Sequence, residues 1–352
     1  MKYKKEEKEQ EIKLETKKKT LKESFIELLH SPRDLIILGI TLLFLIMTLI
    51  PVPYYITAGG GTINISDRIE IANSYSEEGS LNSAYVKELR GNVFTYLLSL
   101  VVPSFEATKT EDVVLEEESK EDYNFREKLE LTMSNNNAVK VAYEALGKEV
   151  RVKSSTLYVG YLDPNAKTDL KVQDIILEVA GEEVFNKADL DSLLTNYSLG
   201  DQVEFTVLRD DEEVKCQAEK FLLNDAYKFG LYIIEVNEYE TSPEVSFNFK
   251  DNESGPSGGL MMTLSIYNKL TEEDITKGRK IVGTGTIDEE GNVGEIGGVK
   301  YKIMGAVSAK ADLFLVPVGN YEEAVSFAEE KGYDIPIIPV ATFDEALQAL
   351  ET

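Results

Sequence analysis

Residues 255–300 read GPSGGLMMTLSIYNKLTEEDITKGRKIVGTGTIDEEGNVGEIGGVK, and this stretch decides the fold expected for the carboxy-terminal part of the chain. A glycine-rich turn is followed directly by an apolar helix over 260–270, and the pair Gly297-Gly298 is followed by a second helix over 299–309. Strand-like residues and a hairpin turn at 288–292 lie between the two helices. The pattern predicts an α+β domain built from strand, turn and helix units.

Ser257 lies in the first of these turns, where a reactive hydroxyl is useful. Glycines around a serine let a substrate backbone approach closely. Free amides at the start of the following helix can stabilise a developing oxyanion. We therefore take Ser257 as a candidate nucleophile, which needs a neighbouring base to act. The residues expected to shape the turn and the oxyanion site are Gly255, Pro256, Gly258 and Gly259.

An apolar segment near the amino terminus predicts a membrane anchor. Leu35–Val52 has eighteen residues and no charge, the lower length for a spanning helix. A cleaved signal peptide is the weaker alternative, because the apolar run is long and no small-x-small cleavage site follows it. Ten Lys or Arg residues precede the segment, and only Arg68 falls in the next twenty residues. The positive-inside rule then places the amino terminus in the cytoplasm and the rest outside.

The base that would activate Ser257 is expected to be a lysine. The chain has one histidine, His30, which falls on the cytoplasmic side of the predicted anchor, and one cysteine, Cys216. A histidine-based triad or a zinc site of the HExxH type is thereby excluded outside the cell. Lys300 lies in the first turn of the second helix, where the helix dipole and burial would lower its pKa. Lys302 is the rival, and the residues alone do not choose between them.

Residues 224–352 resemble the proteolytic domain of the Lon family. GPSGG at 255–259 is similar to the family motif G-P-S-A-G, with Gly258 in place of alanine, and IGGVKYKIMGA at 296–306 is similar to its glycine-pair and lysine stretch. The resemblance implies that Ser257 is the nucleophile and that Lys300, the first lysine after the glycine pair, is the base. It also implies that Thr284 hydrogen-bonds and orients that lysine.

Residues 152–223 resemble a PDZ domain of the type found in bacterial proteases. The resemblance rests on LKVQDIILEVAGEEV at 170–184, in which Gln173 and Ala180 depart from the family pattern. It implies that a peptide adds as a strand between the stretch Leu157–Gly160 and the helix over 187–196. The predicted groove residues are Leu157, Tyr158, Val159, Gly160, Leu190 and Leu194.

The chain is thus predicted to be an α+β multidomain protein with five parts. They are a charged cytoplasmic tail (1–33), a transmembrane anchor (34–54), an extracellular α/β region packing with the protease domain (55–151), the PDZ-like domain (152–223) and the Lon-type domain (224–352). Within the α/β region, Ala58–Gly61 is expected to be a flexible loop before a strand. In Lon-like peptidases with a PDZ domain, which the chain resembles, the region before the PDZ domain packs with the protease domain, and this would make the PDZ-like domain an insertion.

This combination resembles the PDZ-containing Lon-like peptidases of Gram-positive bacteria. It implies an ATP-independent serine endopeptidase at the outer face of the cell membrane, which cleaves secreted peptides or membrane and surface proteins. The net charge of −26 argues against nucleic acid as a partner. We expect no cofactor and no metal. The sequence does not decide whether the protein forms a homo-oligomer. One alternative is a catalytically silent PDZ scaffold. The other is a protein that binds phosphate at the 254–259 turn, but the carboxylates of Asp251 and Glu253 would repel phosphate there.

Overall fold

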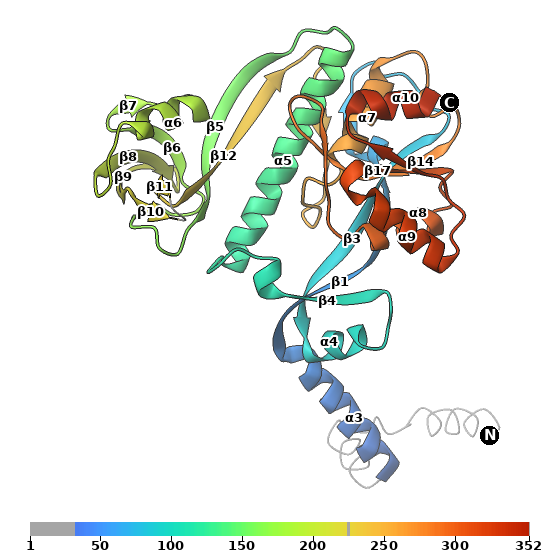
Figure 1. Cartoon of the computed structure of the whole chain (residues 1–352). Helices are drawn as coiled ribbons and strands as arrows, with labels where there is room; N and C mark the ends of the chain where they lie inside the picture. Colours follow the sequence, from blue (N-terminus) through green and yellow to red (C-terminus); the bar gives the residue numbers. More distant parts are fainter. Residues whose placement is uncertain (1–31, 224–225, 352) are drawn as a thin grey trace, which may run out of the picture.

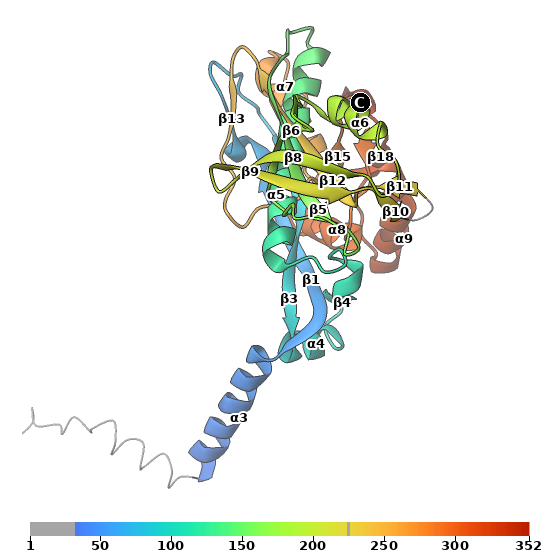
Figure 2. The same ribbon diagram turned by 90° about the vertical axis from the view of Figure 1, so that its left-hand side faces the viewer.

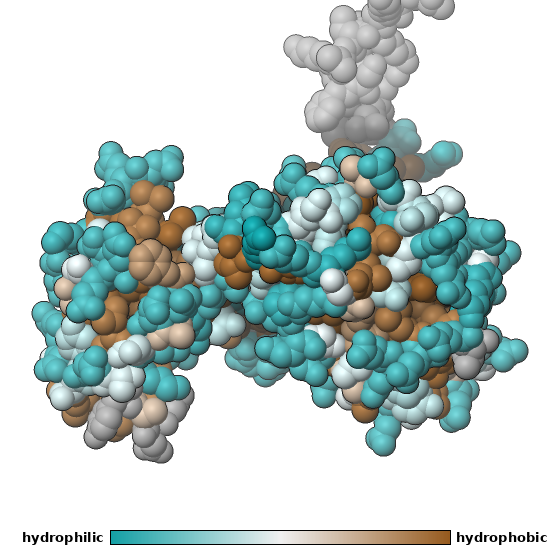
Figure 3. All heavy atoms as spheres, turned by 90° about the horizontal axis from the view of Figure 1, so that it is seen from above, coloured by the Kyte–Doolittle hydropathy of each residue, from teal (hydrophilic) through white to brown (hydrophobic). Residues whose placement is uncertain are grey.

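The computed structural model describes residues 32–223 and 226–351. Figure 1 and Figure 2 show an amino-terminal helix that projects from a large lobe, and a small lobe carried on two long strands. We define the large lobe as residues 51–150 and 241–351 and the small lobe as residues 151–240. Figure 3 shows the two lobes as separate masses, with hydrophilic side chains over most of the face in view. His30 and all but the last two residues of the predicted cytoplasmic tail lie outside the described residues.

Helix α3 (Pro32–Leu49) is made of the predicted anchor residues. None of its side chains is buried, and among the described residues it is the one helix long and apolar enough to cross a membrane. The helix ends earlier than the predicted boundary at residue 54, because β1 begins at Pro51. Proline removes a backbone donor and disfavours helical geometry in the residue before it, so Pro51 and Pro53 end the helix.

One six-stranded sheet forms the centre of the large lobe, and both segments of the chain contribute to it. Its order is β18-β17-β14-β3-β1-β4, with β14 parallel to β3 and to β17, and β3-β1-β4 antiparallel. Strands from before and after the small lobe therefore pair directly, at β3 and β14. The bounds are β1 (Pro51–Asn64), β3 (Ser80–Asn92), β4 (Phe105–Lys109), β14 (Lys280–Gly283), β17 (Leu313–Pro317) and β18 (Ile337–Val340).

Helices cover both faces of this sheet, as the alternation of buried side chains requires. Ile281 and Leu315 belong to one core, whereas their neighbours Val282 and Phe314 belong to the other. The first core is shared with α5 (Lys120–Ala145), α7 (Gly259–Leu270) and α10 (Phe343–Glu351), and the second with α8 (Val299–Ser308) and α9 (Tyr321–Lys331).

The predicted loop at Ala58–Gly61 is wrong, because these residues lie inside β1. The pairing of β1 with β3 shifts between Gly59 and Gly61, which marks a bulge. A side chain on Gly60 would meet the carbonyl oxygen of Tyr85 at 2.0 Å. The glycines therefore allow the two strands to approach each other closely.

Short elements complete the large lobe. Helix α4 (Val93–Ser99) joins β3 to β4, β2 (Ile69–Ile71) pairs with β13 (Val245–Phe247), and β15 (Thr286–Ile287) pairs with β16 (Val293–Gly294) around the predicted hairpin turn. Three 3-10 turns are η1 (Ile65–Arg68), η2 (Thr110–Asp112) and η3 (Val318–Asn320).

The small lobe is a sheet of order β12-β5-β6-β8-β9 with one helix on it. Strands β5 and β12 form a long antiparallel ribbon, whose ends at Arg151 and Glu240 connect the small lobe to the end of α5 and to β13 (Figure 1). The small lobe is thus inserted into the large one. Its elements are β5 (Arg151–Leu162), β6 (Ile175–Val179), β7 (Glu182–Glu183), α6 (Lys187–Thr195), β8 (Gln202–Arg209), β9 (Glu212–Glu219), β10 (Phe221–Leu223), β11 (Ala226–Lys228) and β12 (Leu231–Glu240).

Candidate active site

The Ser257 turn is held in place by hydrogen bonds from two sides. The Gly255 amide donates to the carbonyl of Glu127 (3.1 Å), and the Ser134 hydroxyl donates to the carbonyl of Pro256 (3.1 Å), so α5 fixes the turn from one side. Gly255 has a φ of +87°, which favours glycine. Gly258 is the residue before α7, and a side chain on Gly259 would meet the backbone nitrogen of Ile287 at 2.9 Å. Ser257 itself is half-buried at the start of α7.

Thr284 holds the other side of the turn and also forms a hydrogen bond with a lysine. Its hydroxyl donates to the carbonyl oxygen of Ser257 (3.0 Å), and the next amide, that of Gly285, donates to the same oxygen (2.9 Å). The Thr284 hydroxyl also accepts a hydrogen bond from the Nζ of Lys302 (3.1 Å). Thr284 is fully buried and follows directly after β14. One hydroxyl therefore links the backbone of Ser257 to the amine of Lys302.

Lys302 is a buried lysine on the apolar face of α8. Its relative exposure is 2%, and it shares that face with Val299 and Ala306, which lie three residues before it and four residues after it. Burial lowers the pKa of Lys302 to about 8, and the charge of Glu88 opposes this shift only in part. An amine with such a pKa is neutral in a useful fraction of molecules near pH 8, as a general base requires.

Lys300, the predicted base, lies on the exposed side of α8 and not beside Thr284. Its side chain is 46% exposed, and its Nζ lies 3.6 Å from a carboxylate oxygen of Glu323 on α9. Two residues along a helix turn a side chain by about 200°, so Lys300 and Lys302 point to different sides of α8. The lysine beside Thr284 is Lys302. The residues that could have revealed it are Val299 and Ala306, which place position 302 on the core side.

The serine and the lysine are linked through Thr284. Among the described residues, no hydrogen bond joins the Ser257 hydroxyl to the Lys302 amine; the Thr284 hydroxyl stands between the lysine and the serine backbone. Hydrogen bonds between catalytic groups are often long in the absence of substrate and shorten when it binds. No group of three or more His, Cys, Asp or Glu side chains that could hold a metal ion is found in the same part of the chain.

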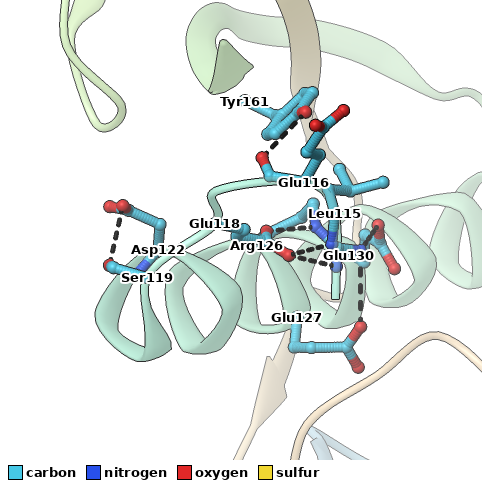
Figure 4. A network of polar contacts seen from close by, with 9 residues as sticks. All are labelled: Leu115, Glu116, Glu118, Ser119, Asp122, Arg126, Glu127, Glu130 and Tyr161. Atoms are coloured by element: carbon cyan, nitrogen blue, oxygen red, sulfur yellow. Dashed lines mark hydrogen bonds and ion pairs between the residues drawn. The ribbon is translucent and has the colours of Figure 1, made fainter. Parts of the chain in front are cut away.

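Helix α5 carries a network of charged side chains beside the serine turn (Figure 4). Arg126 forms ion pairs with Glu118 (2.8 Å) and Glu130 (3.2 Å), and lies 3.6 Å from Glu127. Burial, followed by the charge of Glu130, raises the pKa of Glu127 to about 7, and Arg126 opposes the shift. A side chain on Gly255 would meet a carboxylate oxygen of Glu127 at 3.1 Å. The carboxyl of Glu127 thus lies directly against the turn that holds Ser257.

A hollow of about 820 Å³ separates α6 from α5. Leu190 and Leu194 of α6, two of the predicted groove residues, line it, and Arg126 and Glu130 line it from α5. The remaining wall is formed by the β10–β11 region and by the free edge of β12, including Leu231, Tyr232 and Ile233. The hollow is therefore bounded by both lobes.

The predicted groove strand is corrected, because Leu157–Gly160 does not offer a free edge. Strand β5 pairs with β12 on one side, with Ile233 opposite Val159, and with β6 on the other. Leu157 and Val159 are buried in the core of the small lobe, and the ring of Tyr158 packs against Phe125 of α5. A side chain on Gly160 would meet Ile234 at 2.5 Å. Strand β12 takes the edge position next to α6, although it lies outside the predicted range of the PDZ-like domain (152–223).

Comparison with known families matches both lobes. The family described as PDZ domain matches residues 141–219, and the family described as Lon protease (S16) C-terminal proteolytic domain matches residues 250–351. The second range contains Ser257, Thr284, Lys300 and Lys302.

Curated relatives are Lon proteases from several bacteria. The Lon protease of Neorickettsia sennetsu is 29% identical over 133 residues, which are 37% of this chain and 15% of that protein. The Lon protease of Azospirillum brasilense is 27% identical over 175 residues (49% and 20%), and that of Trichlorobacter lovleyi is 34% identical over 98 residues (28% and 12%). The chain spans a fifth or less of the length of these relatives. It combines a PDZ domain with the proteolytic domain of a Lon-type serine peptidase, as a PDZ-containing Lon-like protease does.

Proposed function

We propose that this protein is a serine endopeptidase that uses Ser257 as nucleophile and Lys302 as general base, at the outer face of a membrane and without ATP. The observation that carries the proposal is the buried amine of Lys302, bound to Thr284, whose hydroxyl also holds the backbone of Ser257. A buried lysine costs stability, and its lowered pKa suits a general base. The proposed independence from ATP is supported by the given sequence, in which no Walker A motif is found.

The chemistry follows from these positions. The Ser257 hydroxyl attacks the carbonyl carbon of the scissile peptide bond, and its proton passes to the neutral amine of Lys302. The protonated Lys302 then gives that proton to the leaving amine, which departs and leaves an acyl ester on Ser257. Water attacks the ester with Lys302 again as base. The oxyanion lies near the start of α7, where free backbone amides and the helix dipole favour negative charge.

Thr284 acts as a positioning residue in this scheme. Its hydroxyl accepts from Lys302 and donates to the Ser257 carbonyl, so it fixes the amine relative to the serine without reacting itself. The accepted hydrogen bond is one that either the charged or the neutral amine can donate. Burial of Thr284 and of Lys302 keeps water away, which strengthens the contact between them.

A direct assay tests the function. We expect the full chain in lipid nanodiscs to cleave a mixed peptide pool at defined bonds without ATP, with new termini read by mass spectrometry. The Ser257→Ala protein, prepared in the same way, controls for contaminating proteases. Equal cleavage by both proteins would rule out Ser257. The absence of cleavage by the unaltered chain would favour the alternative function, a PDZ scaffold that binds peptides without cutting them.

The hollow between α5 and α6 is the proposed peptide groove. The edge of β12 at Leu231–Ile233 has free backbone groups to which an extended peptide can add as a strand, and Leu190 and Leu194 face the same space. Because α5 walls this hollow and also holds the Ser257 turn, a long substrate that occupies the hollow lies next to the helix that fixes the nucleophile. The groove therefore serves substrates that extend well beyond the scissile bond.

A charge placed in the groove tests this assignment. Leu194→Glu is expected to raise KM for the longest cleaved peptide about tenfold, since a buried leucine contact is worth more than the 1.4 kcal/mol that a tenfold change requires. Short peptides that cannot reach the hollow should keep their kcat/KM. Leu199→Glu is the matched control, because Leu199 is 57% exposed and does not line the hollow. An unchanged KM for long peptides in Leu194→Glu would exclude the hollow as a binding groove.

A further inference from the structure

The connection between β3 and β4 exposes apolar side chains that the protease chemistry does not use. It consists of α4 and residues 100–103, and residues 93–103 contain no charged residue. Leu97 is 45% exposed, Leu100 65% and Val101 76%. Such a contiguous apolar surface marks a contact with another molecule or with a membrane.

Helix α4 lies against the end of α3 (Figure 1 and Figure 2). The rings of Phe94 and Phe44 pack edge to face with their centroids 4.6 Å apart. The amide of Val93 donates to the carbonyl of Ile50 (3.0 Å), and a capping box between Asn92 and Thr95 fixes the start of α4. The position of α4 relative to α3 is therefore set by direct contacts.

These contacts determine how deep α4 must lie if α3 crosses a bilayer. The 18 residues of α3 span about 27 Å, slightly less than the hydrocarbon thickness of about 30 Å, so the whole helix is needed to cross. Phe44 lies five residues before Leu49, the last residue of α3, which places it about 7.5 Å inside the end of the span. Phe94 touches Phe44 and shares that depth. Helices that lie in a membrane surface are buried to a similar depth, about 5–10 Å.

We propose that α4 and Leu100–Val101 insert into the leaflet next to the large lobe as a second membrane contact, which adds to the anchor α3. The proposal rests on the proposed role of α3 as a transmembrane anchor. The occupant of the apolar surface is lipid, because the surface is continuous with the lipid-facing side of α3 and carries no charge over residues 93–103. With two attachments, the large lobe cannot turn freely about the short link between α3 and β1, and its active site keeps a fixed orientation to the bilayer.

The chain contains no tryptophan, so single tryptophan probes report without background. We would place one probe in each of three full-length proteins: Leu100→Trp in the proposed contact, Leu45→Trp in α3, and Leu199→Trp in the small lobe. Each is reconstituted into vesicles of phosphatidylcholine and phosphatidylglycerol, with and without bromine on the acyl chains. Val101→Trp is a second probe of the contact, should Leu100→Trp fail to fold.

We expect Leu100→Trp to emit at shorter wavelength than Leu199→Trp and to lose fluorescence to brominated lipid as Leu45→Trp does. Quenching of Leu45→Trp without quenching of either contact probe would overturn the insertion of α4 and leave the anchor intact. A blue-shifted contact probe that brominated lipid does not quench would also overturn it, because protein, such as a second copy, would then cover the surface. An unquenched Leu45→Trp would overturn the anchor and the insertion together.

Discussion

Replacing Lys302 by alanine is expected to lower kcat/KM for peptide cleavage by about 10³-fold or more, whereas Lys300→Ala should leave it within about twofold. The reason is the different surroundings of the two lysines. Lys302 is buried beside Thr284, and Lys300 is exposed and faces Glu323. The measurement is the initial rate of cleavage of one defined peptide by the full chain, with Ser257→Ala as the inactive reference. Loss of activity in Lys300→Ala with retention in Lys302→Ala would reverse the assignment.

The charge and the basicity of Lys302 can be separated by a conservative change. Lys302→Arg keeps a cation, but a guanidinium does not give up its proton, so this variant should be as inactive as Lys302→Ala. In the unaltered protein, kcat/KM should rise with pH through about 8, where the amine of Lys302 becomes neutral. A flat profile from pH 6 to 9, or an active arginine variant, would contradict a general-base role.

The Ser257 turn and its surroundings could be anticipated from sequence because their signals are local. Glycines before an apolar run predict a turn and a helix start, and the structure places α7 there. The choice between Lys300 and Lys302 depends on helix phase. Position 302 shares a face with Val299 and Ala306, so the helix period could have assigned it, whereas counting from the glycine pair led to the exposed residue.

Long-range pairing explains what the sequence could not show. The bulge at Gly59–Gly61 looks like a loop in isolation, because the reason for its glycines is Tyr85 on the neighbouring strand. The groove strand was misplaced for a similar reason. The resemblance to a PDZ domain predicts that Leu157–Gly160 offers an edge to the peptide, and only the return of β12 beside it shows that this edge is taken. Local pattern does not determine which strand pairs with which.

Replacing Lys302 by methionine is expected to stabilise the protein as well as inactivate it. A pKa lowered from 10.5 to about 8 means that the folded state disfavours the ammonium form. The cost is present in full below pH 8 and disappears as pH rises through 10.5, where the amine is neutral in both states. Each pKa unit is worth about 1.4 kcal/mol, so the cost near pH 6 is about 3 kcal/mol. Methionine fills a similar volume and carries no charge.

The free energy of unfolding of Lys302→Met should therefore exceed that of the unaltered protein by about 3 kcal/mol at pH 6, and by about half as much near pH 9.5. Urea unfolding followed by tyrosine fluorescence gives both values. Lys300→Met is the matched control, with a change within about 0.5 kcal/mol and no trend with pH, since its side chain is exposed. Equal stability of Lys302→Met and the unaltered protein at pH 6 would mean that Lys302 bears no buried charge. A gain that shrinks with pH would show that the fold gives up stability to hold this amine ready for proton transfer.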